Sequence, residues 1–257
     1  MSHHIIEASE LCYSYPDGTV ALTGVDFLIT HGESVAIVGA NGAGKSTLLL
    51  HLAGCLLPTS GTLRVGDWPL TPRTVHSIRR SVGFVFQDPD DQLFMPTVFD
   101  DVAFGPLNIG LTVEEAGERV RRALDTVGAG HVARRAPYRL SGGEKRAVTI
   151  AAVLAMSPDV LVMDEPSINL DSRNRRRLIE LLRSFTHTRI IATHDLDLVL
   201  DVCARTIVLA EGRVVADGPT HEVFSDAGVL DRGHLEPPLR LQGCPVCGGE
   251  RGGDGGE

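Results

Sequence analysis

The sequence predicts an α/β fold built around a parallel sheet. Residues 34–38 form a short apolar run that leads into a glycine-rich turn, and residues 46–53 then have helical character. Two later apolar runs, residues 160–163 and 189–193, each end in polar residues, as strands of a parallel α/β sheet do. Residues 173–185 between them have helical spacing, which completes a strand–helix–strand pattern.

The remaining elements are expected around this core. Residues 5–15 and 20–30 alternate apolar and polar side chains on either side of Pro16-Asp17-Gly18, which predicts a β-hairpin. In chain order we further expect strands at 62–65 and 82–86, helices at 113–127 and from Gly143 to 156, and a hairpin of strands 206–209 and 213–216.

Composition excludes some classes of protein. The longest unbroken apolar run covers only residues 150–156, whereas a helix needs about 20 apolar residues to cross a bilayer. Residues 1–10 are polar and do not resemble a signal segment, so we expect a cytosolic location. The net charge of −9 argues against a nucleic-acid partner, which would favour a basic surface.

A phosphate-binding loop follows the strand at 34–38. The run fits the pattern G-x-x-x-x-G-K-[ST] with a strand before it and a helix after it. Glycines let backbone N–H groups approach phosphate oxygens, and the helix directs its positive end at the same anion. The alternative is a glycine-rich turn that binds nothing. The nucleotide-binding candidates are Gly39, Ala40, Asn41, Gly42, Ala43, Gly44, Lys45, Ser46 and Thr47.

Within this loop two side chains have assigned tasks. Lys45 is expected to reach the β- and γ-phosphates, and the Ser46 hydroxyl to bind Mg²⁺. Only one other lysine, Lys145, occurs among the 24 basic residues, so a lysine in this loop is not a generic surface charge. The loop therefore predicts a bound nucleotide with Mg²⁺, and ATP as that nucleotide is what the resemblance described below implies.

Two carboxylates follow the strand at 160–163. Asp164 is expected to contact Mg²⁺, and Glu165 to polarise the water that attacks the γ-phosphate. Two acids after a strand could instead begin a helix or a turn. Their occurrence together with the phosphate loop favours catalysis.

The run Leu140-Ser141-Gly142-Gly143-Glu144 resembles the signature sequence of ATP-binding cassette (ABC) ATPases, and it precedes Asp164 by the spacing usual in that family. The resemblance implies a P-loop NTPase fold with a RecA-like core, an antiparallel β subdomain and a helical subdomain. It implies an ATP-binding domain at 4–240, with the helical subdomain at about 88–158. Ser141, Gly142 and Gly143 would bind the γ-phosphate held by the other subunit of a head-to-tail dimer. The same residues also fit an ordinary capping box.

Other family elements recur in order. Gln87 looks like the glutamine that contacts Mg²⁺ and senses the membrane partner, and Tyr15, rather than Tyr13, looks like the aromatic that stacks on adenine. His194 resembles the histidine that contacts the γ-phosphate. Residues 168–171 resemble the D-loop that crosses the dimer interface. The bulky pair Ile168-Asn169 departs from the family pattern and could alter coupling between the two sites.

A finer match lies in residues 86–94, followed by 101–106. These runs look like the ATPases of energy-coupling-factor importers, including the cobalt and nickel group, which import metal ions or vitamins. The match implies an identical or related second ATPase subunit, integral membrane subunits as partners, and a place at the cytoplasmic face of the cell membrane. A solvated acidic turn is the alternative for residues 86–94.

Two other functions remain as hypotheses. A soluble ABC ATPase of DNA repair or translation would show a long coiled-coil insertion or two cassettes. A non-enzymatic scaffold would show a degraded Glu165, His194 or signature. Neither feature is found in this sequence.

The cysteines divide into two groups. Cys12, Cys55 and Cys203 have apolar neighbours and are expected in the core. Cys244 and Cys247 form a C-x-x-C pair in a glycine-rich tail, 241–257, that we expect to be disordered. The pair could contribute to a metal site with a second copy or with His234, or could bind nothing.

Overall fold

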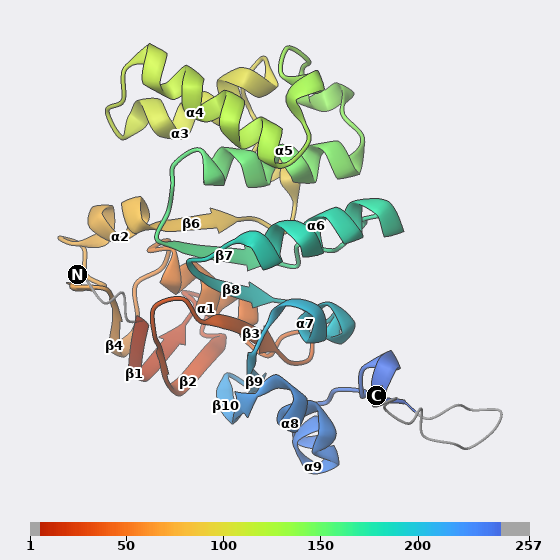
Figure 1. The fold of residues 1–257 in the computed structure, drawn as a ribbon. Coiled ribbons are helices and arrows are strands. Elements are labelled where there is room, and N and C mark those ends of the chain that lie inside the picture. Colours follow the sequence, from red (N-terminus) through yellow and green to blue (C-terminus); the bar gives the residue numbers. More distant parts are fainter. Residues whose placement is uncertain (1–5, 243–257) are drawn as a thin grey trace.

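The computed structural model describes residues 6–242 and contains two β-sheets (Figure 1). The smaller sheet is antiparallel with the order β2-β1-β4-β5, and the larger has the order β10-β9-β3-β8-β7-β6. In the larger sheet all neighbours are parallel except β10, which pairs antiparallel with β9. The strands are β1 (Ile6–Ser14), β2 (Val20–Ile29), β3 (Ser34–Val38), β4 (Ser60–Val65), β5 (Trp68–Pro69), β6 (Val82–Val85), β7 (Val160–Asp164), β8 (Thr188–Ala192), β9 (Arg205–Ala210) and β10 (Arg213–Pro219).

The parallel sheet is covered on both faces. Alternate side chains of β3 point to opposite sides, so Val35 and Ile37 join one core while Ala36 and Val38 join the other. The first core also holds α1 and the antiparallel sheet, and the second holds α6, α7, α8 and α9. Burial on both faces explains why the central strands read as continuous apolar runs.

A third layer of helices lies beyond the β6 and β7 edge of the sheet (Figure 1). Helices α3, α4 and α5 share a core that includes Val102, Val120 and Val148. The helices of the whole described chain are α1 (Lys45–Leu52), α2 (Val75–Ser81), α3 (Val98–Asn108), α4 (Val113–Thr126), α5 (Gly142–Leu154), α6 (Ser172–Ser184), α7 (Leu196–Val202), α8 (Thr220–Ser225) and α9 (Ala227–Arg232), with short 3₁₀ turns η1 (Pro89–Asp91), η2 (Gly130–Val132), η3 (Pro137–Arg139) and η4 (Leu239–Leu241).

The expected α/β class is confirmed, and each predicted strand and helix is present to within a few residues. The helices α2, α3, α7, α8 and α9 were not predicted. Between residues 6 and 242, no helix has the length and apolar character needed to cross a membrane. The last described element, η4, ends at Leu241, and the predicted tail lies outside the described residues except for residues 241 and 242.

The prediction of three core cysteines is right only for Cys203. Cys203 is buried, and burial raises the pKa of its thiol to about 11. Cys12 is half-buried and Cys55 is exposed. Cys55 follows the end of α1 in a turn, so its apolar sequence neighbours do not cover it.

Packing of α6 against the sheet gives a stability prediction. Leu182 is fully buried in the second core. Leu182→Ala is expected to lower the free energy of unfolding by about 2–5 kcal/mol, since it removes apolar contacts and leaves a cavity. Urea titration measures this change, and Glu180→Ala at an exposed position of the same helix is the control. A loss below about 1 kcal/mol would contradict the packing of α6.

Candidate active site

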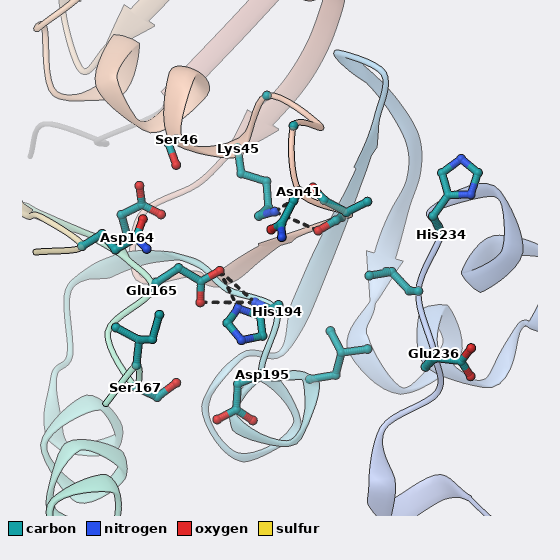
Figure 2. A pocket seen from close by; sticks show the side chains of 18 of the residues that line it. Asn41, Lys45, Ser46, Asp164, Glu165, Ser167, His194, Asp195, His234 and Glu236 are labelled. Carbon is teal, nitrogen blue, oxygen red and sulfur yellow. Dashed lines mark hydrogen bonds and ion pairs between the residues drawn. The ribbon is translucent and has the colours of Figure 1, made fainter. Parts of the chain in front are cut away.

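A cleft of about 1230 Å³ opens where the carboxyl ends of β3, β6, β7 and β8 meet. Ligand sites of open α/β sheets form at this edge because the loops after several strands converge there. Figure 2 shows Lys45, Asp164, Glu165 and His194 directed toward one another in this cleft. The fold thus brings together four predicted residues from three separate segments of the chain.

The loop after β3 is shaped by its glycines. Gly39 has φ 152° and Gly44 has φ 100°, and a Cβ at Gly39 would collide with the carbonyl of Leu209. All predicted loop residues line the cleft except Ala43, whose side chain is buried. This conformation presents the backbone and the start of α1 to the cleft.

Lys45 lies across the same loop. Its Nζ donates hydrogen bonds to the carbonyl oxygens of Gly39 (2.8 Å) and Ala40 (3.0 Å). The side chain is 8% exposed, and burial lowers the pKa of the ammonium, an effect that Glu165 and Asp164 oppose. Among the described residues, Lys45 binds carbonyl oxygens and forms no ion pair with a carboxylate. A buried cation of this kind is suited to bind an anionic ligand.

Asp164 and Ser46 form the part of the cleft that fits a divalent cation. Burial raises the pKa of Asp164, while a hydrogen bond from Ser46 lowers it. Its Oδ1 is buried and has no hydrogen-bond partner. An unsatisfied carboxylate oxygen beside a hydroxyl is the oxygen-rich donor set that Mg²⁺ prefers, so these residues fit the expected metal.

Glu165 is held by the end of the next strand. Its Oε2 accepts a hydrogen bond from Thr193 Oγ1 (2.8 Å), and its Oε1 accepts from the backbone N–H of His194 (3.1 Å). The Oε1 also lies 2.9 Å from His194 Nδ1. Glu165 has φ 46°, a conformation uncommon outside glycine that often marks functional sites. The contacts fix the carboxylate in the cleft.

Tyr15 and Tyr13 have different surroundings. Tyr15 lines the cleft, and its hydroxyl lies 2.9 Å from Oγ1 of Thr47. Tyr13 is absent from the cleft lining and packs edge-on against Tyr15 and against the buried ring of His51. Tyr15 is thus the aromatic placed to meet a ligand in the cleft.

Gln87 reaches the cleft from the end of β6. Its side chain is exposed and lines the same space as Lys45 and Asp164. Its backbone carbonyl accepts a hydrogen bond from Nη2 of Arg146 at 2.5 Å. The side chain faces the cleft while its main chain is bound to α5.

Ser141, Gly142 and Gly143 do not join this cleft. Ser141 caps α5 in a capping box with Glu144, as expected, and Ser141 and Gly142 are exposed. A Cβ at Gly143 would lie 2.9 Å from Cγ of Asn174 at the start of α6. The second predicted anion-binding helix start thus faces outward, where another molecule could meet it.

Some residues of the site were not predicted. Thr193 is fully buried and orients Glu165, and its position just before His194 at a strand end was the available signal. The segment from His234 to Leu239 forms a further wall of the cleft (Figure 2). Arg240 ties this segment to α7 through Asp197 and Asp201. Nothing in the residue pattern places it there.

The cysteine hypothesis cannot be placed on the structure. Cys244 and Cys247 lie outside residues 6–242, and within that range no group of three or more His, Cys, Asp or Glu side chains could hold a metal ion. His234 is exposed at the cleft wall.

Sequence comparisons match this chain to one family. The family model described as ABC transporter matches residues 22–168. A putative ABC transporter ATP-binding protein of Geobacter sulfurreducens is 63% identical over 96% of this chain and 100% of its own length. An energy-coupling factor transporter ATP-binding protein of Methanospirillum hungatei, EcfA1, is 44% identical over 92% of this chain and 87% of its own.

Solved structures give a similar result. The structure of cbiO1 from Clostridium perfringens, part of the ABC transporter complex cbiONQ, matches with a TM-score of 0.78 and 41% identity over 89% of this chain and 94% of that chain. The ATP-binding cassette MJ0796, in a dimeric post-hydrolysis state bound to ADP and phosphate, matches with a TM-score of 0.76 and 28% identity over 84% of this chain and 98% of that chain.

Proposed function

This chain belongs to the ABC transporter family, as an ATP-binding subunit that hydrolyses ATP, and from that premise we propose that it drives a membrane importer of the energy-coupling-factor type. The observation that carries the importer proposal is an exposed surface formed by the aromatic rings of Phe94 and Phe104, and Phe94 belongs to the run 86–94 that contains Gln87. The likeness of the whole chain to EcfA1 and to cbiO1 supports the same proposal.

The roles of the cleft residues follow from their positions. Lys45 and the backbone of the loop after β3 bind the β- and γ-phosphates, and Tyr15 stacks on adenine. Glu165 accepts a hydrogen bond, and then the proton, from the attacking water, while His194 contacts the γ-phosphate and keeps the carboxylate oriented. Lys45 and Glu165 are buried, which strengthens the electrostatic contacts that these two side chains make.

Ser46, Asp164 and Gln87 would hold the magnesium ion. When bound, Mg²⁺ neutralises charge that develops on the phosphate oxygens. Ser46 supplies a hydroxyl, Asp164 its unpartnered Oδ1, and Gln87 a side-chain amide oxygen that reaches the cleft.

The outward position of Ser141, Gly142 and Gly143 supports a head-to-tail dimer. In one chain these residues lie outside the cleft that holds Lys45 and Glu165. A second subunit turned by a two-fold axis would bring its own Ser141 and glycines to the γ-phosphate. ATP then closes the dimer, and hydrolysis opens it.

The surface proposed for the membrane subunit is built from Phe94 and Phe104. Phe94 is 63% exposed and Phe104 43% exposed, and their rings pack edge to face at 5.0 Å. Buried Asp101 holds the loop in place, because its Oδ1 accepts hydrogen bonds from the backbone of Phe94 (3.0 Å) and Met95 (2.9 Å). Exposed aromatic pairs on a fixed loop are typical of interaction sites.

The proposed partner and cargo rest on the resemblance of residues 86–94 and 101–106 to energy-coupling-factor ATPases. The chain lies at the cytoplasmic face of the cell membrane, bound to integral membrane subunits that select a cobalt or nickel ion or a vitamin. A soluble ABC ATPase of DNA repair or translation is not favoured, since the relatives named above are transporter subunits.

We expect tagged full chain, purified from gently solubilised membranes, to recover a multi-span membrane protein and a small substrate-binding membrane protein. Phe94→Ser combined with Phe104→Ser should reduce that recovery about tenfold or more, since buried aromatic anchors dominate interface affinity. Mass spectrometry of the co-purifying proteins measures the result and also shows whether a second ATPase chain is present.

Trp68→Ser is the control, because Trp68 is also an exposed aromatic, 45% exposed, but lies in the antiparallel sheet. Recovery of soluble or ribosomal proteins alone would contradict the importer proposal. Equal recovery with the double variant and with Trp68→Ser would contradict the proposed surface.

A further inference from the structure

Tyr13 is an aromatic residue close to the cleft that the mechanism proposed above does not use. It lies near the end of β1, and its ring meets the ring of Tyr15 edge to face, with 5.0 Å between centroids and 82° between planes. The same ring also meets the imidazole of His51 edge to face, at 4.7 Å and 75°. Since Tyr13 does not line the cleft, it can affect a ligand there only through its neighbours.

His51 and Thr47 link this aromatic pair to the phosphate-binding helix α1. His51 Nδ1 lies 2.7 Å from the carbonyl oxygen of Thr47, and because a carbonyl only accepts, Nδ1 is the donor. The side chain of the same threonine turns to the other tyrosine, with 2.9 Å between Thr47 Oγ1 and the hydroxyl of Tyr15. The contacts therefore run in a closed circuit from Tyr15 through Tyr13, His51 and Thr47 back to Tyr15.

This circuit restricts the Tyr15 side chain at both ends. The backbone of Tyr15 is held in a turn, since its N–H donates to the carbonyl of Thr19 and its carbonyl accepts from Gly18, both at 2.9 Å. Its ring is then contacted by Tyr13 from β1 and its hydroxyl by Thr47 from α1. A ring that is already ordered loses less conformational entropy when a base stacks on it, so it binds the base more tightly.

The charge state of His51 indicates which part of a nucleotide this support affects. His51 is fully buried, and burial lowers the pKa of its imidazole, while contacts with the backbone of Thr47 and Leu57 oppose that shift. The imidazole is therefore neutral at neutral pH and adds no positive charge beside the phosphate loop. Its effect should fall on the base that meets Tyr15 and not on the phosphates.

We propose that Tyr13 and His51 are positioning residues that hold the Tyr15 ring in the orientation in which it stacks on the adenine base. This inference rests on the stacking role given to Tyr15 in the proposed function. It predicts that loss of either supporting ring weakens the binding of a nucleotide but leaves unchanged the binding of a diphosphate that has no base.

The test compares ADP with pyrophosphate, both in the presence of Mg²⁺, by isothermal titration calorimetry of the full chain carrying Tyr13→Leu. Leucine keeps an apolar side chain against the first core but removes the aromatic edge. We expect the dissociation constant for ADP to rise about three- to tenfold, as for the loss of one aromatic pair. The dissociation constant for pyrophosphate should change less than about twofold, because the phosphate loop is not altered.

Tyr13→Phe is the matched control, because it keeps the ring and removes only its hydroxyl, and it should bind ADP within about twofold of the unsubstituted chain. His51→Leu is the second variant and should show the same loss for ADP alone. Thermal unfolding shows whether each variant is folded, and the two Tyr13 variants decide the matter even if His51→Leu does not fold.

Unchanged ADP affinity in Tyr13→Leu would overturn the inference. An equal loss for ADP and for pyrophosphate would also overturn it, since Tyr13 would then only support the phosphate loop. Tyr15→Ala, titrated in the same way, separates this inference from the role on which it rests. If Tyr15→Ala binds ADP as tightly as the unsubstituted chain, the stacking role fails and the inference falls with it. If Tyr15→Ala binds ADP more weakly and Tyr13→Leu does not, only the inference fails.

Discussion

Glu165→Gln is expected to lower the rate of ATP hydrolysis by about 100-fold or more while ATP binding persists, since a positioned general base contributes 10²–10⁴-fold. The amide keeps the shape of the side chain but cannot take a proton from water. The hydroxyl of Thr193 (2.8 Å) and the backbone N–H of His194 (3.4 Å) both donate to Oε2, so an amide oxygen in that position keeps both donors. Phosphate release under saturating ATP measures the turnover.

The Glu165→Gln chain should also accumulate as an ATP-bound dimer, because the step that opens it is blocked. Glu7→Gln on β1 is the control, since Glu7 is exposed and lies in the antiparallel sheet. If Glu165→Gln hydrolyses ATP at the rate of the Glu7→Gln chain, the assignment of Glu165 as the base is wrong.

Lys45→Ala is expected to raise the dissociation constant for ATP by roughly 30- to 100-fold, as loss of hydrogen bonds to a charged group costs about 2–3 kcal/mol. The substitution removes a buried cation from the phosphate loop and leaves unchanged the glycines whose positive φ angles set the loop conformation. The effect should therefore fall on binding, in contrast to Glu165→Gln. Equilibrium titration with a fluorescent ATP analogue measures it.

The chain supplies a matched control, because Lys145 is the only other lysine in the sequence. Lys145→Ala removes the same side chain from α5, outside the cleft, and should leave the dissociation constant of the monomer unchanged. Equal affinities for the two variants would show that Lys45 does not bind the phosphates.

The sequence could predict the parallel sheet and most of the cleft because both depend on local patterns. An apolar run, a glycine loop and a helix follow one another directly around Lys45, and polar residues mark the ends of β7 and β8. Parallel strands bring such ends to one edge, so Asp164 and His194 could be placed together without knowing the whole fold.

Other features depend on contacts between distant segments. Helix α3 was not predicted because it contains Gly105 and Pro106, which disfavour a helix. Packing stabilises the helix despite these residues, and Gly105 lies against the side chain of Met156. Arg146 reads as one more charge of α5 until the fold brings it to carbonyls about sixty positions earlier in the chain. Tertiary contact, which single-sequence patterns do not encode, decided both cases.

The close approach of Gly143 to Asn174 has an evolutionary consequence. Asn174 is itself fixed by both side-chain oxygens of Asp171, at 2.8 Å from its backbone N–H and 3.0 Å from its amide nitrogen. A side chain at position 143 must therefore displace the Asn174 side chain, and this displacement breaks the hydrogen bond from its amide nitrogen to Asp171. We therefore expect the two positions to be coupled in evolution: a substitution at 143 costs less where residue 174 has a shorter side chain.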